Sequence, residues 1–135
     1  MHPLQRAATR ITRKLLPFAP LLAALVFGGW AMYVNRQAGL TIALRSGLAQ
    51  GVYAIFCTQI VGRVAVDVFR RTLGMRWRCI LSFGASFLAM IAIPAVLHRT
   101  IGTPEILAAV LPGLIWGSGY IVVILGALSR DIEFQ

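Results

Sequence analysis

Apolar residues occur along this chain in four long runs, separated by short segments that are polar or contain glycine. Each run approaches or exceeds the ~20 residues that an α-helix needs to cross the hydrocarbon core of a bilayer. The pattern predicts an all-α membrane protein, with residues 1–135 forming a single domain of four transmembrane helices. We expect the spans at about residues 15–34, 40–69, 80–97 and 106–128.

Short connections divide these spans into two helical hairpins. Turns at residues 35–39 and 98–105 close the hairpins, and a basic loop at residues 70–78 joins them. Both hairpins then have the same orientation in the membrane. The second run is longer than one crossing requires, so its helix must tilt or project beyond the bilayer.

Basic residues beside the spans predict the orientation, because cytoplasmic loops carry an excess of lysine and arginine. Only Arg36 and Arg99 lie in the turns that close the hairpins. We therefore expect both termini in the cytoplasm, and we expect the protein in a bacterial inner membrane. The basic residues on the predicted cytoplasmic side are Arg6, Arg10, Arg13, Lys14, Arg70, Arg71, Arg76, Arg78 and Arg130.

The segment before the first span has its own pattern. Leu4, Ala8, Ile11 and Leu15 follow helical spacing, and the basic residues take the other side. This arrangement fits a short amphipathic helix on the anionic inner leaflet. A disordered basic leader fits the same residues equally well.

Composition and charge narrow the class of protein. The chain is 59% hydrophobic with a mean hydropathy of +0.80, which a soluble domain of this size could not bury. Its net charge of +9 lies mainly in the loops, as membrane topology requires, so nucleic acid is not an expected partner.

Catalytic motifs and metal-ligand spacings are absent from the sequence. His2 and His98 are isolated, and the spacing of Cys57 and Cys79 suits neither metal nor redox chemistry. We therefore predict a protein that is not an enzyme and that has no metal or cofactor.

Arg45 and Arg63 lie eighteen residues apart in the second run. Eighteen residues make five turns of α-helix, so both guanidiniums lie on one face, ~27 Å apart along the axis. Gln59 and Asp67 share that face. A helix with this pattern is expected to present a polar face toward a ligand or an interface.

The depth of Arg63 allows two interpretations. With the bilayer midplane near Phe56, Arg63 lies ~10 Å inside it, where a charge costs at least ~2.5 kcal/mol unless it snorkels or is paired. In the structural interpretation Arg63 pairs with Asp67, four residues on, and Arg45 anchors the outer end. In the functional one, a polar groove binds a lipid phosphate through Arg45, Gln59, Arg63 and Asp67.

Small residues predict where helices pack closely. Gly47 and Gly51 form a GxxxG pattern nearly opposite Arg45, and Gly113 and Gly117 repeat that spacing in the fourth span. Such ridges allow close approach of a second helix, either within the chain or in a partner.

The layout of two hairpins resembles the GtrA-like family of small four-span membrane proteins. Each second helix follows a glycine-bearing turn, AGLTIAL at Ala38–Leu44 and IGTPEIL at Ile101–Leu107. Leu128-Ser129-Arg130 with Phe134 looks like that family's closing pattern, whereas Phe69-Arg70-Arg71 departs from its counterpart. The resemblance implies a protein that accompanies a membrane glycosyltransferase and binds or flips a polyprenyl-phosphate-linked sugar for cell-envelope glycan synthesis.

Two other functions stay open on the sequence. A non-catalytic accessory subunit could hold a membrane enzyme or a second copy of the chain through its glycine ridges. A small multidrug exporter would have a similar size, but such exporters depend on a glutamate in the first span. Here no acidic residue lies between Leu15 and Val34.

Overall fold

The structure is a computed structural model, and it describes residues 19–133, with side chains described for residues 19–130. This part of the chain is helical throughout, without strands, which confirms the predicted all-α class for these residues. The possible amphipathic helix before the first span lies outside the described residues. The elements are α2 (Ala19–Val34), η2 (Arg36–Ala38), α3 (Leu40–Arg71), α4 (Arg78–Thr100) and α5 (Ile106–Glu133).

Three of these helices are long and apolar enough to cross a membrane, namely α3, α4 and α5. The described part of the first predicted span, α2, is apolar and has 16 residues, which extend ~24 Å as an α-helix. The helices of the described chain are therefore compatible with an integral membrane protein.

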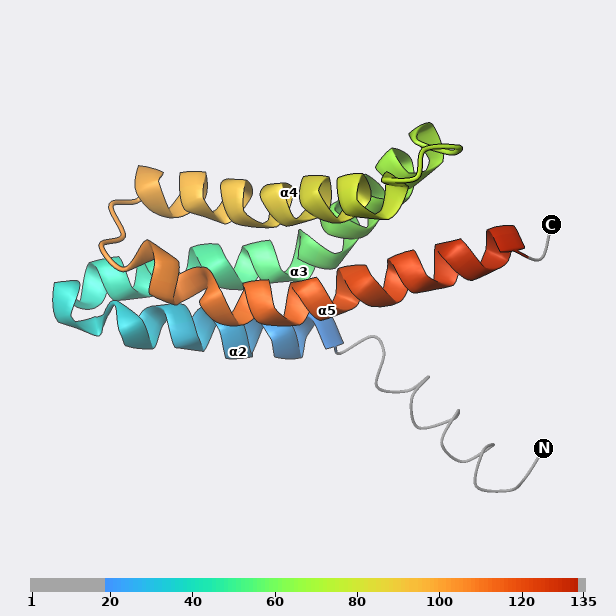
Figure 1. Ribbon diagram of the computed structural model, residues 1–135. Helices are drawn as coiled ribbons and strands as arrows, with labels where there is room; N and C mark the ends of the chain where they lie inside the picture. The colour runs from blue at the N-terminus through green and yellow to red at the C-terminus, as the bar shows by residue number, and fades with distance from the viewer. Residues whose placement is uncertain (1–18, 134–135) are drawn as a thin grey trace, which may run out of the picture.

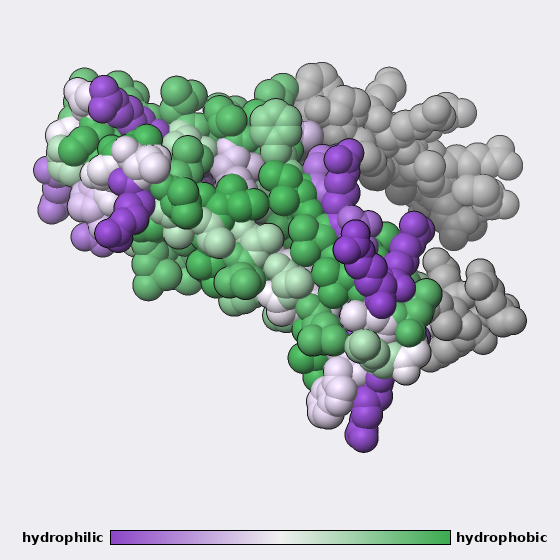
Figure 2. Space-filling view, turned by 90° about the horizontal axis from the view of Figure 1, so that it is seen from above, coloured by the Kyte–Doolittle hydropathy of each residue, from purple (hydrophilic) through white to green (hydrophobic). Residues whose placement is uncertain are grey.

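The four long helices lie side by side, and consecutive helices run in opposite directions (Figure 1). Helix α3 contacts each of the other three, and α2 also contacts α5. Figure 2 shows hydrophobic residues over the middle of the bundle and hydrophilic residues gathered toward its two ends. This distribution suits a molecule surrounded by lipid along its middle.

Glycines with positive φ make the turns before α3 and α5 possible. Gly39 has φ 96° and directly precedes α3, and Gly102 has φ 74° in the turn before α5. Residues with a side chain rarely adopt this conformation, so the chain can reverse sharply only with glycine here. These are the glycine-bearing turns that the sequence places before the second helix of each pair.

The apolar core lies where α3, α4 and α5 meet. Its buried members are Val61, Ala65, Phe69, Met90, Ile121 and Leu125. Helix α2 packs against the other part of α3 through small residues instead. A Cβ atom on Gly28 would lie 2.7 Å from the carbonyl oxygen of Gly47, and one on Gly51 would lie 3.1 Å from that of Ala24. The GxxxG of α3 thus allows α2 to approach its backbone.

Candidate functional site

A surface hollow of about 310 Å³ lies between α3 and α5, and we call it the Arg63 hollow. Its polar side chains come mainly from α3, and its apolar walls include Val66 and Ile124. The lining of the hollow therefore combines one cation, one carboxylate, one amide and two hydroxyl groups. The complete lining is Thr58, Gln59, Gly62, Arg63, Val66, Asp67, Tyr120 and Ile124.

Gly62 allows α5 to approach α3 at this hollow. A Cβ atom on Gly62 would lie 3.0 Å from the hydroxyl oxygen of Tyr120. Because that atom is missing, Tyr120 reaches the backbone of α3 and donates a hydrogen bond of 3.3 Å to the carbonyl oxygen of Thr58. The side chain of Tyr120 thus forms part of the wall that α5 contributes, together with Ile124.

Three of the four predicted polar residues line the Arg63 hollow together. Gln59, Arg63 and Asp67 follow one another at four-residue intervals on α3, so one helical face presents all three. Arg45 is not part of the lining. It lies on α3 eighteen residues from Arg63, and its side chain is exposed elsewhere on the helix.

The ion pair between Arg63 and Asp67 that the structural interpretation requires is not formed among the described side chains. Both side chains are exposed, and among the side chains of residues 19–130 no salt bridge within 4.0 Å joins them. A spacing of four residues on one helix permits such a pair without requiring it. The guanidinium of Arg63 is therefore free of protein carboxylates within the described part of the chain.

Gly113 and Gly117 of the fourth predicted span face the interior of the bundle. A Cβ atom on Gly117 would collide with the sulfur of Met90, and one on Gly113 would lie 3.6 Å from the amide nitrogen of Gln50. Both glycines thus serve contacts between α5 and its own neighbours in this chain.

A chain of buried polar side chains crosses the bundle, and the sequence analysis missed it. His98 Nε2 lies 3.0 Å from Oε1 of Gln50, and His98 Nδ1 lies 3.1 Å from the hydroxyl of Thr103. All three side chains are at most 5% exposed. The available signal was Gln50 itself, because an amide deep in an apolar span tends to face the bundle interior and to find a partner there.

A second buried polar cluster connects the turn between α2 and α3 with the turn that precedes α5. Asn35 donates through Nδ2 to the hydroxyl of Ser46 at 3.1 Å and to the carbonyl of Ala31 at 3.0 Å. Its Oδ1 accepts a hydrogen bond of 3.0 Å from the backbone N–H of Glu105, just before α5. Asn35 therefore joins α2, α3 and the start of α5.

A cavity of about 250 Å³ lies among α2, α3 and α5, and we call it the Gln50 cavity. It shares Thr58 and Tyr120 with the Arg63 hollow, so the two spaces are neighbours along α3. Trp116 and Tyr120, which the sequence places on one face of α5, both line it. The complete lining is Phe27, Gln50, Tyr53, Ala54, Cys57, Thr58, Val61, Gly113, Trp116, Gly117 and Tyr120.

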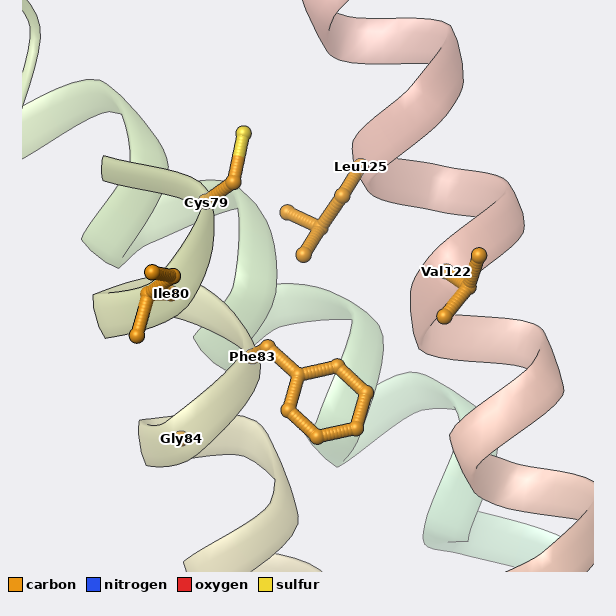
Figure 3. A pocket seen from close by; sticks show the side chains of 6 residues that line it. All are labelled: Cys79, Ile80, Phe83, Gly84, Val122 and Leu125. Carbon is orange, nitrogen blue, oxygen red and sulfur yellow. The ribbon is translucent and has the colours of Figure 1, made fainter. Parts of the chain in front are cut away.

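An apolar groove of about 410 Å³ separates α4 from α5 nearer the basic loop (Figure 3). Cys79, Ile80, Phe83 and Gly84 line it from α4, and Val122 and Leu125 line it from α5. Its only polar side chain is the thiol of Cys79. Such a surface can accommodate hydrocarbon but has no group that would select a head group.

Within the described residues, no group of three or more histidine, cysteine, aspartate or glutamate side chains could hold a metal ion. Charged side chains line the Arg63 hollow and also a hollow of about 460 Å³ that includes Arg36 and Glu105. Compared with protein-family models, curated proteins and solved structures, the chain matches none of them.

Proposed function

We propose that this protein is an integral membrane protein that binds the phosphate of a lipid in the Arg63 hollow. The lipid we favour is a polyprenyl-phosphate-linked sugar, which the protein flips or presents to a membrane glycosyltransferase. The phosphate is inferred from the side chains of the hollow. The polyprenyl sugar is inferred from the resemblance to GtrA-like proteins.

The exposed, unpaired guanidinium of Arg63 is the observation that carries this proposal. A cation at hydrocarbon depth is unfavourable without a counter-charge, and no protein carboxylate of the described chain lies within ion-pair distance of it. Phosphate oxygens match the planar fork of arginine donors and supply the missing charge. A lipid phosphate fits this position because the lipid chain stays in the bilayer.

The other residues of the hollow support the same ligand. The amide of Gln59 and the hydroxyl of Thr58 can donate to phosphate or sugar oxygens, and Val66 and Ile124 offer apolar walls for the first part of a hydrocarbon chain. Asp67 accepts hydrogen bonds, which suits sugar hydroxyls better than phosphate. Arg45 has no role in this proposal.

The proposed orientation places the Arg63 hollow toward the cytoplasm. Arg70 and Arg71 end α3, and Arg76 and Arg78 follow in the connection to α4. These cations favour the cytoplasmic side of a bacterial inner membrane. With both termini on that side, Arg63 faces the leaflet in which polyprenyl-phosphate sugars are assembled by cytoplasmic enzymes.

Binding of undecaprenyl phosphate to the purified protein in lipid nanodiscs tests the proposal. We expect Arg63→Ala to weaken binding by about tenfold or more, since a charge-assisted hydrogen bond contributes ~1.5–3 kcal/mol. Arg45→Ala is the matched control, because it removes the same charge from the same helix outside the hollow. Undecaprenol, which lacks the phosphate, should bind much more weakly to the wild-type protein.

Two outcomes would overturn the proposal. Unchanged binding by Arg63→Ala would show that the hollow does not hold the phosphate. Equal competition by phosphatidylglycerol would show that the site takes lipid phosphates in general, and the polyprenyl carrier would then be wrong as the specific ligand.

An accessory subunit without a ligand of its own is the second candidate. Its predicted docking ridges, however, are used inside this chain, because Gly47, Gly113 and Gly117 face other helices of the same bundle. A partner enzyme or a second copy would have to dock elsewhere. Co-purification with a glycosyltransferase that persists in Arg63→Ala would favour this candidate.

A further inference from the structure

His98 makes one hydrogen bond with Thr103 and one with Gln50. When His98 is neutral, the donor and the acceptor of each bond can be assigned. An amide oxygen only accepts, so the proton lies on Nε2 of His98, which donates to Oε1 of Gln50 at 3.0 Å. Nδ1 of His98 then accepts from the hydroxyl of Thr103 at 3.1 Å. The chain ends at the amide nitrogen of Gln50, which has two N–H groups to donate.

That amide nitrogen lacks a partner in the described chain. Gln50 is only 2% exposed, and among residues 19–130 no hydrogen bond is made by its Nε2 atom. The atom faces Gly113, where a Cβ would lie 3.6 Å away, and both residues line the Gln50 cavity. The amide group is thus held in place by His98, and its nitrogen keeps a small accessible surface in a residue that lines the cavity.

The remaining lining of the Gln50 cavity is mostly carbon and partly aromatic. Phe27, Tyr53, Trp116 and Tyr120 all contribute rings, and no charged side chain lines the cavity. The hydroxyl of Tyr53 is already used, since it donates to the carbonyl of Met90 at 3.3 Å. Trp116 is 74% exposed, so the cavity opens at the bundle surface, where lipid-soluble molecules can enter.

We propose that the Gln50 cavity binds a flat, apolar ring that carries a carbonyl oxygen, as in a membrane quinone. The carbonyl accepts a hydrogen bond from Nε2 of Gln50, and the ring packs against Trp116 and Tyr120. Such a ligand satisfies the free donor and leaves few polar groups of its own unpaired. A sugar does not, because most of its hydroxyls would be buried without partners.

The size of the cavity limits the ligand. Its volume of about 250 Å³ is smaller than the ~300–1,000 Å³ typical of sites for drug-sized molecules, so it accommodates one ring and leaves the tail in the lipid. This proposal concerns binding alone and includes no electron transfer. It does not depend on the phosphate ligand of the Arg63 hollow.

Quenching of tryptophan fluorescence by decyl-benzoquinone, with the protein in nanodiscs, tests this inference. Trp77→Phe serves as the background, since it removes the exposed tryptophan between α3 and α4 and leaves Trp30 and Trp116 as the fluorophores. We expect a saturable component on top of non-saturable quenching, and we expect Trp116→Phe to abolish that component. A decyl-substituted ring without carbonyl groups should compete at least about tenfold more weakly.

Two substitutions test the cavity itself, and each is compared with a control substitution. Gly113→Leu places a side chain in the cavity, where its Cβ would lie 3.6 Å from Nε2 of Gln50, and it should abolish the saturable component. Gly119→Leu is the matched control, because no atom lies within 4 Å of a Cβ there. Gln50→Leu should weaken binding about tenfold, and Gln37→Leu, at an exposed position, should not.

The absence of saturable quenching in the Trp77→Phe protein would overturn the proposal. So would saturable quenching that Gly113→Leu leaves unchanged, because the ligand would then bind outside the cavity. If Gln50→Leu does not fold, the comparison of Gly113→Leu with Gly119→Leu still decides between these outcomes.

Discussion

His98 of α4 and Gln50 of α3 are hydrogen-bonded to each other in the interior of the bundle, with 3.0 Å between Nε2 and Oε1. The two residues are 48 positions apart in the sequence, and each is almost fully buried. A polar group in such a place is costly when it has no partner, so the pair fixes how α3 and α4 face each other.

His98→Leu should lower the free energy of unfolding by about 1–2 kcal/mol, because Gln50 and Thr103 lose their common partner. Reversible unfolding in mixed micelles of increasing SDS content would measure the change. The double variant His98→Leu with Gln50→Leu should recover part of the loss, since both polar partners are then removed. A double variant less stable by the sum of the single effects would contradict this coupling.

Asn35→Leu should lower the free energy of unfolding by about 1–2 kcal/mol, because it leaves the backbone N–H of Glu105 without its partner and leaves the hydroxyl of Ser46 with only its 3.4 Å hydrogen bond to the carbonyl of Ala31. The same SDS titration measures the change. Gln37→Leu, two residues away and exposed, is the control and should stay within about 0.5 kcal/mol of wild type. Equal effects of the two substitutions would show that the cluster around Asn35 contributes nothing.

Gly28→Ala should destabilise the packing of α2 on α3 by about 1–3 kcal/mol, since the added Cβ would lie 2.7 Å from the backbone oxygen of Gly47. Gly29→Ala provides the comparison, because no atom lies within 4 Å of a Cβ at that position. It should be neutral or slightly stabilising, as alanine favours a helix more than glycine does. Resistance of the chain to added protease in micelles would report the difference, and equal sensitivity of both variants would argue against close packing here.

Reporter fusions should show both termini in the cytoplasm. Green fluorescent protein joined after Gln135 should fluoresce, because it folds on the cytoplasmic side, and alkaline phosphatase joined after Ala38 should be active, because it needs the other side. Phosphatase joined after Gly74, in the basic loop, is the control and should be inactive. Activity at Gly74 together with inactivity at Ala38 would reverse the proposed orientation.

The features that sequence could predict are those set by local spacing. Helical periodicity alone brings Gln59, Arg63 and Asp67 to one face, and the lengths of the apolar runs locate α3, α4 and α5 closely. Of the two interpretations of Arg63, the ion pair with Asp67 is not formed among the side chains of residues 19–130, because a four-residue spacing permits such a pair without requiring it.

The buried polar chain depends instead on how separate helices are rotated about their axes. His98 looked isolated, and Gln50 was not singled out, because their contact requires two distant segments to face each other across α3 and α4. The same rotation turns Gly113 toward Gln50 and so creates the cavity between them. Periodicity within one segment carries no information about such a contact.

The hydrogen bonds of α5 are unevenly distributed along its length. Two hydrogen bonds hold its first part. The side chain of Asn35 accepts one from the backbone N–H of Glu105, just before α5, and Trp30 donates the other to the carbonyl of Ala108 at 2.8 Å. After Tyr120, the side-chain bonding to other helices in the described part of the chain is the contact of Cys79 with Ser129, at 3.6 Å. Apolar contacts hold the rest of that part, including the buried side chains of Ile121 and Leu125 in the core where α3, α4 and α5 meet. The position of the second half of α5 therefore depends mainly on how well its side chains fit those of α3 and α4, whereas directional hydrogen bonds fix its first half.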